Sequence, residues 1–201
     1  MSDAPGPRGA HYWLMKSEPD TFSIADLERV KVEPWSGVRS TFARFHMRKM
    51  EVGDLALFYH SSVLPPGAVG VSKIVRTKVV DQTQFDPDSQ YFDPKATRDK
   101  PIWDCVDVEY IATFPHQVTL ERMRSDPMLA DMPVLRIGRL SVQPCAEHEY
   151  RRVVELGQTP PPPSAPKPKA KVKPKRPAAK TRPAPNKKPA KKPAKRPANK
   201  R

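Results

Sequence analysis

The polar residues best suited to bind a ligand follow a short apolar stretch near the amino terminus. Residues 12–15 are β-favouring or apolar, and Lys16, Ser17, Glu18 and Pro19 follow without a break. A strand that carries polar groups to its end is a common floor for a pocket, although a core strand that runs into a turn gives the same pattern. Because side chains alternate along a strand, Lys16 and Glu18 lie opposite Ser17, and we expect them to pair with each other.

The loop at residues 35–39 is a second candidate for ligand binding. Trp35 lies among Ser, Gly and Arg residues rather than in an apolar run, so burial alone does not explain it. A stacking surface and a plug on the core both remain open for this indole. Gly37 beside Val38 indicates a close backbone approach that leaves main-chain groups available to a ligand. Arg39 suits either a polar or anionic ligand group or a surface ion pair.

Serines and cations supply the remaining candidate contacts. Ser61 and Ser141, like the serine at position 17, lie in or beside predicted strand ends, where turn or capping chemistry is the ordinary alternative. Arg44 and Arg48 are four residues apart and share one face of a predicted helix, with Lys49 beside them. This stripe is suited to phosphate groups, although charged helix faces are often merely solvated.

Metal, cofactor and nucleophile motifs are missing from the sequence. Cys105 and Cys145 have no CxxC pairing, and residues 147–149 lack the spacing of a helical zinc motif. We expect both thiols to be reduced and partly buried, and His60 to be a structural hydrogen-bonding residue rather than a base. We also expect no cofactor and, since no apolar run approaches the ~18 residues of a membrane span, no membrane and a cytoplasmic location.

The elements that position these residues predict an α+β domain with a curved, barrel-like mixed sheet and flanking helices. Strands dominate, no βαβ rhythm appears, and residues 81–104 are rich in Asp, Pro, Gln and Lys, as in a long surface loop. We expect strands at 12–15, 55–60, 68–80, 105–111 and 140–142, and helices at 24–30 (capped by Ser23), 41–50 (capped by Ser40), 120–124 (capped by Thr119) and 146–156 (ended by Gly157).

Charge divides the chain into three parts. Residues 1–10 form a Pro- and Gly-containing leader, residues 11–157 a globular domain, and residues 158–201 a Lys-, Pro- and Ala-rich tail. The tail carries 16 Lys and Arg and no Asp or Glu, so the net charge of +14 belongs to it. Such a composition cannot form a core, so we expect leader and tail to be disordered and the tail to bind polyanions.

A series of motifs in residues 11–157 resembles the EVE domain, a PUA-like fold related to the YTH and ASCH domains. The matching segments occur in order along the globular part: 13–19 (WLMKSEP), 35–39 (WSGVR), 43–44 (AR), 53–54 (GD), 58–61 (FYHS), 66–70 (PGAVG), 91–95 (YFDPK), 103 (W), 106–108 (VDV) and 135–142 (LRIGRLSV).

The resemblance implies a non-enzymatic reader that captures a modified base, most often modified cytosine in DNA rather than RNA. A reader needs an aromatic slot and fixed groups at the edge of the base, and the implied contacts are Ser17, Trp35, Gly37, Val38, Arg39, Ser61 and Ser141, with Arg44, Arg48 and Lys49 on phosphates.

Two other functions remain open. The ASCH relatives imply a small hydrolase acting on modified nucleosides, for which Lys16 and Glu18 are the catalytic candidates. The tail alone is consistent with a sequence-blind nucleic-acid packing protein. We expect a monomer, associated with the nucleoid or, in a eukaryote, located in the nucleus.

Overall fold

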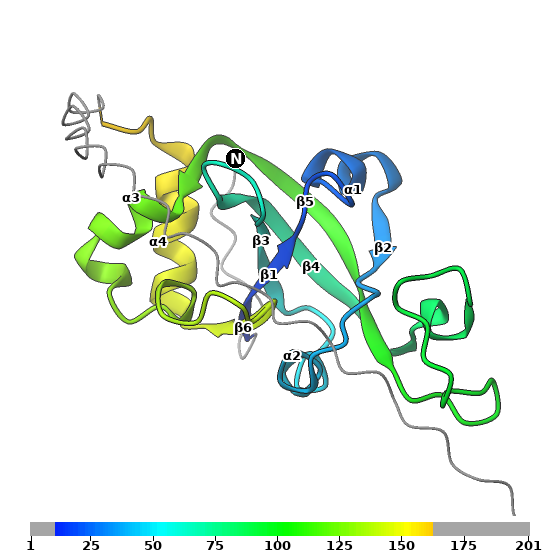
Figure 1. The fold of residues 1–201 in the computed structure, drawn as a ribbon. Coiled ribbons are helices and arrows are strands. Elements are labelled where there is room, and N and C mark those ends of the chain that lie inside the picture. Colours follow the sequence, from blue (N-terminus) through cyan, green and yellow to red (C-terminus); the bar gives the residue numbers. More distant parts are fainter. Residues whose placement is uncertain (1–10, 163–201) are drawn as a thin grey trace, which may run out of the picture. The chain divides into compact units, whose positions relative to one another are not determined.

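The computed structural model describes residues 11–162, in which a six-stranded mixed sheet lies between two groups of helices (Figure 1). The predicted leader and nearly all of the predicted tail lie outside the described residues. The strands are β1 (Tyr12–Ser17), β2 (Val32–Pro34), β3 (Leu55–His60), β4 (Gly67–Val80), β5 (Asp104–Thr119) and β6 (Val142–Cys145), in the order β2-β5-β4-β3-β1-β6. The α-helices are α1 (Ile24–Val30), α2 (Thr41–Met47), α3 (Leu120–Ser125) and α4 (Glu147–Gln158).

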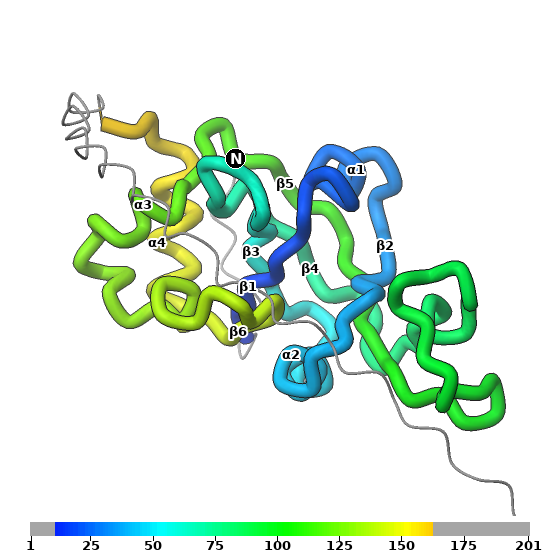
Figure 2. The backbone as a smooth tube through the Cα atoms, in the orientation of Figure 1, coloured from blue at the N-terminus to red at the C-terminus, as the bar shows by residue number. Residues whose placement is uncertain are grey.

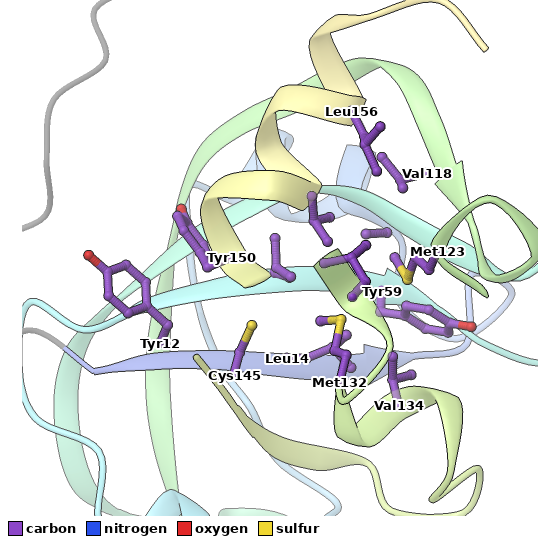
Figure 3. Packing of buried hydrophobic residues seen from close by; sticks show 14 of the residues in the cluster. Tyr12, Leu14, Tyr59, Val118, Met123, Met132, Val134, Cys145, Tyr150 and Leu156 are labelled. Atoms are coloured by element: carbon purple, nitrogen blue, oxygen red, sulfur yellow. The ribbon is translucent and has the colours of Figure 1, made fainter. Parts of the chain in front are cut away.

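Alternation along β1 divides the core into two clusters. Tyr12 and Leu14 face α3 and α4, whereas Trp13 and Met15 face α1 and α2. Figure 3 shows the first cluster. In it α4 packs against β5, β4 and β1, and the rings of Tyr12 and Tyr150 are 4.8 Å apart. A sheet that is apolar on both faces must be covered by helices on both. The observed mixed sheet with helices on each face confirms the predicted α+β architecture.

Side-chain caps set the starts of α1, α2 and α3, as the sequence predicts. The Ser23 hydroxyl accepts a hydrogen bond from the Asp26 amide, and the Asp26 carboxylate accepts one from the Ser23 amide. Ser40 caps α2 and Thr119 caps α3 in the same way, through the amides three residues on. These side chains satisfy amides that have no partner within the helix.

Several predicted boundaries are wrong. The helix α2 ends at Met47 rather than at position 50. β5 runs to Thr119, well beyond position 111, because it pairs with almost the whole of β4. The last strand begins at Val142 rather than at position 140. Gly157 lies inside α4 rather than ending it, because the helix continues to Gln158. The helix packs so closely against Phe114 that a side chain at position 157 would clash with the ring.

A buried carboxylate joins the start of β1 to the turn before β3. Asp54 is 2% exposed and accepts hydrogen bonds from the His11 amide, the Glu51 amide and, at 2.8 Å, the indole Nε1 of Trp13. A buried carboxylate is tolerated when its oxygens are satisfied in this way.

Within residues 11–162, the helices are all too short or too polar to cross a membrane.

The fit between α4 and β5 yields a test by substitution. A Cβ at Gly157 would lie 2.6 Å from Cγ of Phe114, whereas one at Gly138 would meet nothing within 4 Å. Alanine normally stabilises a helix relative to glycine, but here we expect Gly157→Ala to lower the free energy of unfolding by about 1–3 kcal/mol. Urea denaturation measures this change, with Gly138→Ala as a near-neutral control. A Gly157→Ala variant as stable as the wild type would contradict the packing described.

Candidate functional site

A cavity of about 830 Å³ opens at the carboxyl ends of β1 and β3. It is larger than two other hollows of about 410 and 520 Å³ among the described residues. Its lining comes from the end of β1, the loop after β3, the segment before β6 and the loops at 35–39 and 81–103. All seven residues expected to contact a ligand line it: Ser17, Trp35, Gly37, Val38, Arg39, Ser61 and Ser141.

Strand pairing brings the three serines together. β1 and β3 are parallel, so their carboxyl ends lie side by side, and the Ser61 amide donates to the Ser17 carbonyl at 2.8 Å. β6 is antiparallel to β1, and the Lys16 amide donates to the Ser141 carbonyl at 2.8 Å. The Ser17 hydroxyl is used locally, because it donates to the Phe22 carbonyl at 2.6 Å. The sheet itself therefore gathers the predicted hydroxyls at one rim.

The carboxylate of Asp81 holds the 35–39 loop in place. Its Oδ2 accepts from the Gly37 amide at 2.9 Å and from Nη1 of Arg39 at 2.7 Å, and its Oδ1 accepts from the Thr83 amide and hydroxyl. Burial works to raise the pKa of Asp81, but these hydrogen bonds outweigh it and hold the pKa below the ordinary aspartate value. Arg39 thus forms a largely buried ion pair rather than a surface one.

Tyr91 forms a second aromatic wall that the sequence analysis missed. Gly37 has a φ of +78°, and a Cβ there would lie 2.6 Å from the Tyr91 ring, so only glycine permits this close approach. Arg39 donates to the Tyr91 carbonyl through Nε at 2.9 Å, and its guanidinium lies 5.5 Å from the centre of the ring. Figure 2 shows the backbone of residues 35–39 running from β2 to α2 beside the loop that carries Tyr91.

Trp35 packs into the core and also borders the cavity. Its side chain is 7% exposed and meets the Phe58 ring edge-on at 5.3 Å and 82°, as a core residue would. It also lines the cavity, and its amide is held by the Val106 carbonyl at 2.7 Å. A rigid indole at a cavity wall is a surface on which a flat ligand can stack.

Lys16 and Glu18 do not pair with each other, contrary to the sequence-based expectation. The Lys16 amine donates to the Gly138 carbonyl at 2.8 Å and lies over the Tyr59 ring, and burial lowers its pKa. The Glu18 carboxylate accepts from the Ser62 hydroxyl at 2.8 Å. The strand ends before Glu18, so strict alternation no longer applies there, and both side chains line the cavity.

The predicted phosphate stripe lies on α2 and at its end, and none of its residues lines the large cavity. Arg44 donates to the Ile102 carbonyl at 2.7 Å, and its guanidinium lies 4.7 Å from the centre of the Trp103 ring. Arg48 pairs with Asp104, and Lys49 lies over the ring of Phe45. Phosphate binding by these three cations stays a prediction.

Arg139, by contrast, is an exposed cation on the lining of the cavity that the sequence analysis did not select. Within residues 11–162 it forms no ion pair. The motif at positions 135–142 is the signal that could have identified it, because Ser141 lies in the same segment.

Other reactive groups are structural in this fold. His60 Nε2 accepts from the Ile24 amide at 3.2 Å, as predicted, and burial lowers its pKa. Both cysteines are buried and free, and burial raises the pKa of Cys105 to about 12, so this thiol is protonated at neutral pH. Among the described residues, no three His, Cys, Asp or Glu side chains are grouped as a metal site requires.

Comparisons with known proteins identify relatives over most of the chain. Thymocyte nuclear protein 1 of Mus musculus is 35% identical over 178 residues, covering 78% of this chain and 77% of the relative. The human protein of the same name is 34% identical over 172 residues, covering 75% of each.

Solved structures show the same fold. A hypothetical protein from Leishmania major is 44% identical with a TM-score of 0.73, covering 75% of this chain and 96% of that one. Human THYN1 in complex with DNA containing 5-methylcytosine is 33% identical with a TM-score of 0.71, covering 76% of this chain and 100% of that one. The model of the EVE domain matches residues 11–156. The chain therefore belongs to the EVE domain family.

Proposed function

We propose that the protein is a non-enzymatic reader that captures a modified base, modified cytosine in DNA, in the cavity at the carboxyl ends of β1 and β3. One observation carries this proposal: a cavity of about 830 Å³ combines an indole wall with fixed polar groups on a locked loop. The complex of human THYN1 with DNA containing 5-methylcytosine supports cytosine modification and DNA as the ligand class. The residues that we assign to the base are the seven that line the cavity as predicted.

The energetics divide the work between domain and tail. Extraction of a base from a duplex costs a few kcal/mol, one aromatic stack returns ~1–3 kcal/mol, and a good edge contact returns ~1–3 kcal/mol. The favourable contacts of the pocket therefore only roughly offset the free-energy cost of extracting the base from a duplex. The 16 cations of residues 158–201 supply sequence-independent affinity through counterion release.

The hydrolase alternative is less consistent with the geometry. The Lys16 amine is engaged by the Gly138 carbonyl, and the Glu18 carboxylate is held by Ser62 rather than by this lysine. A general base must lie within hydrogen-bonding reach of the group that it activates. Binding without turnover is therefore the function that we assign to the cavity.

Replacement of the indole tests the stacking role of Trp35. We expect Trp35→Leu, which keeps a smaller apolar side chain in the core, to weaken binding of an oligonucleotide with one 5-methylcytosine about tenfold, because one base stack is lost. Binding of the same oligonucleotide with an abasic site should not change. Tyr110→Leu is the control, because this half-buried aromatic packs against the same cluster without lining the cavity. Equal losses for both oligonucleotides would argue against stacking.

Neutralisation of Asp81 tests whether ligand binding requires a 35–39 loop that is already fixed before the ligand arrives. We expect Asp81→Asn to cost about 2–4 kcal/mol of stability at pH 7 and to weaken 5-methylcytosine binding. Because the folded pKa is depressed, the stabilisation by Asp81 is present above the unfolded-state pKa of about 3.9 and is lost as the pH falls through the folded value.

Urea denaturation between pH 7 and pH 3 measures how the stability of each protein depends on pH. The wild type should lose more stability than Asp81→Asn over that range. Asp88→Asn, at an exposed position in the same loop, is the matched control and should follow the wild type. Parallel pH profiles for all three proteins would mean that Asp81 does not hold the wall electrostatically.

The tail should control salt dependence without controlling base preference. We expect replacement of its 16 Lys and Arg residues by Gln to flatten the plot of log affinity against log salt concentration, because fewer counterions are released. The ratio of affinities for 5-methylcytosine and cytosine should remain as in the wild type. Fluorescence anisotropy across a salt series measures both quantities, and loss of the ratio along with the slope would contradict the division of labour.

A further inference from the structure

Glu18 is an acidic side chain at a site proposed to bind a polyanion, and nothing in the fold requires its charge. It follows β1 directly, lines the cavity and is exposed. None of the ion pairs within residues 11–162 involves it. A carboxylate near phosphates costs binding energy through repulsion, so its presence in the cavity calls for a favourable contact with the ligand.

The position of Glu18 is fixed from both sides. Its carbonyl accepts the amides of Thr21 and Phe22, both at 2.9 Å, which closes a turn directly after β1. Its Oε1 accepts from the hydroxyl of Ser62 at 2.8 Å, while Oε2 accepts no hydrogen bond from residues 11–162. One carboxylate oxygen is thus anchored, and the other is available to a donor on the ligand.

An ionised carboxylate only accepts hydrogen bonds, which restricts the ligand group that it favours. Cytosine and its 5-methyl derivative carry an exocyclic amino group at C4, which donates, whereas uracil and thymine carry an oxygen there, which accepts. Glutamate is a natural acceptor for the cytosine amine. Resting on the proposed function, we propose that Glu18 recognises the exocyclic amino group of the captured base and so excludes thymine and uracil.

Glu33 provides the matched control for this assignment. It also lines the cavity, from β2, but it extends into the neighbouring hollow of about 520 Å³ and accepts no side-chain hydrogen bond within residues 11–162. Glu33→Gln makes the same change in net charge as Glu18→Gln. A general gain in affinity from reduced phosphate repulsion should appear in both variants, so the informative quantity is the preference between bases.

Four single-stranded oligonucleotides separate the amino group from the methyl group. They differ at one central position, which holds cytosine, 5-methylcytosine, uracil or thymine, and single strands avoid differences in the cost of base extraction. We expect the full-length wild type to bind 5-methylcytosine at least about tenfold more tightly than thymine. In Glu18→Gln the amide both donates and accepts, so this ratio should fall to about twofold or less, whereas Glu33→Gln should retain the wild-type ratio.

The outcomes for the two proposals are distinguishable. If methylated and unmethylated bases bind equally, the proposed reader function is wrong. The ratio of affinities for bases with an amino group at C4 and bases with an oxygen there still tests the role of Glu18. If the methyl group matters but Glu18→Gln keeps the wild-type ratio, the role of Glu18 is overturned while the reader function stands. If Glu33→Gln also loses the ratio, the role of Glu18 is overturned too, because a general change in net charge would then explain the loss of base preference.

Discussion

The carboxylate of Asp81 is the constraint on which the cavity depends. It binds the Gly37 amide and the Arg39 guanidinium at once, so a loop that follows β2 is held against a loop that follows β4. Because Asp81 is 2% exposed, an unpaired carboxylate there would be costly, and the pairing is therefore persistent. The position of the 35–39 loop is thus fixed by contacts within the folded chain and does not depend on a ligand.

The sheet supplies the other half of the site. Parallel pairing of β1 and β3 brings two strand ends to the same edge, and antiparallel β6 adds Ser141 next to them. A preorganised site loses less conformational entropy on binding than one that must form around its ligand. The folded domain is suited to selectivity for this reason, while a tail with 16 Lys and Arg and no Asp or Glu is suited to charge-driven retention.

Patterns local in sequence were the predictable part of this fold. The caps at Ser23, Ser40 and Thr119 depend on neighbours within three residues, and they were correctly predicted. Gly157 resembles a helix end, but it lies inside α4, where its contact with Phe114, some forty residues away, leaves no room for a side chain. Sequence alone carries no signal for such a tertiary contact.

The candidate site was predictable to a similar degree. Residues at strand ends and in the Trp35 loop were found, because their polar or aromatic character stands out from a strand pattern. Asp81 was missed because it lies in the long polar loop, outside every matching motif, and polarity alone does not indicate which side chains turn inward. Tyr91 was also missed, although it lies in the matching segment 91–95, which is the signal that could have identified it. The Lys16–Glu18 pairing failed because alternation was extended beyond the end of β1.

The most direct test of base capture is a crystal structure of the full-length chain with an oligonucleotide that contains one 5-methylcytosine. The account predicts that this base leaves the stack and enters the cavity between the ends of β1 and β3, with its ring against Trp35 and its edge toward the serines. A modified base that remains stacked in the nucleic acid, with the cavity unoccupied, would contradict it.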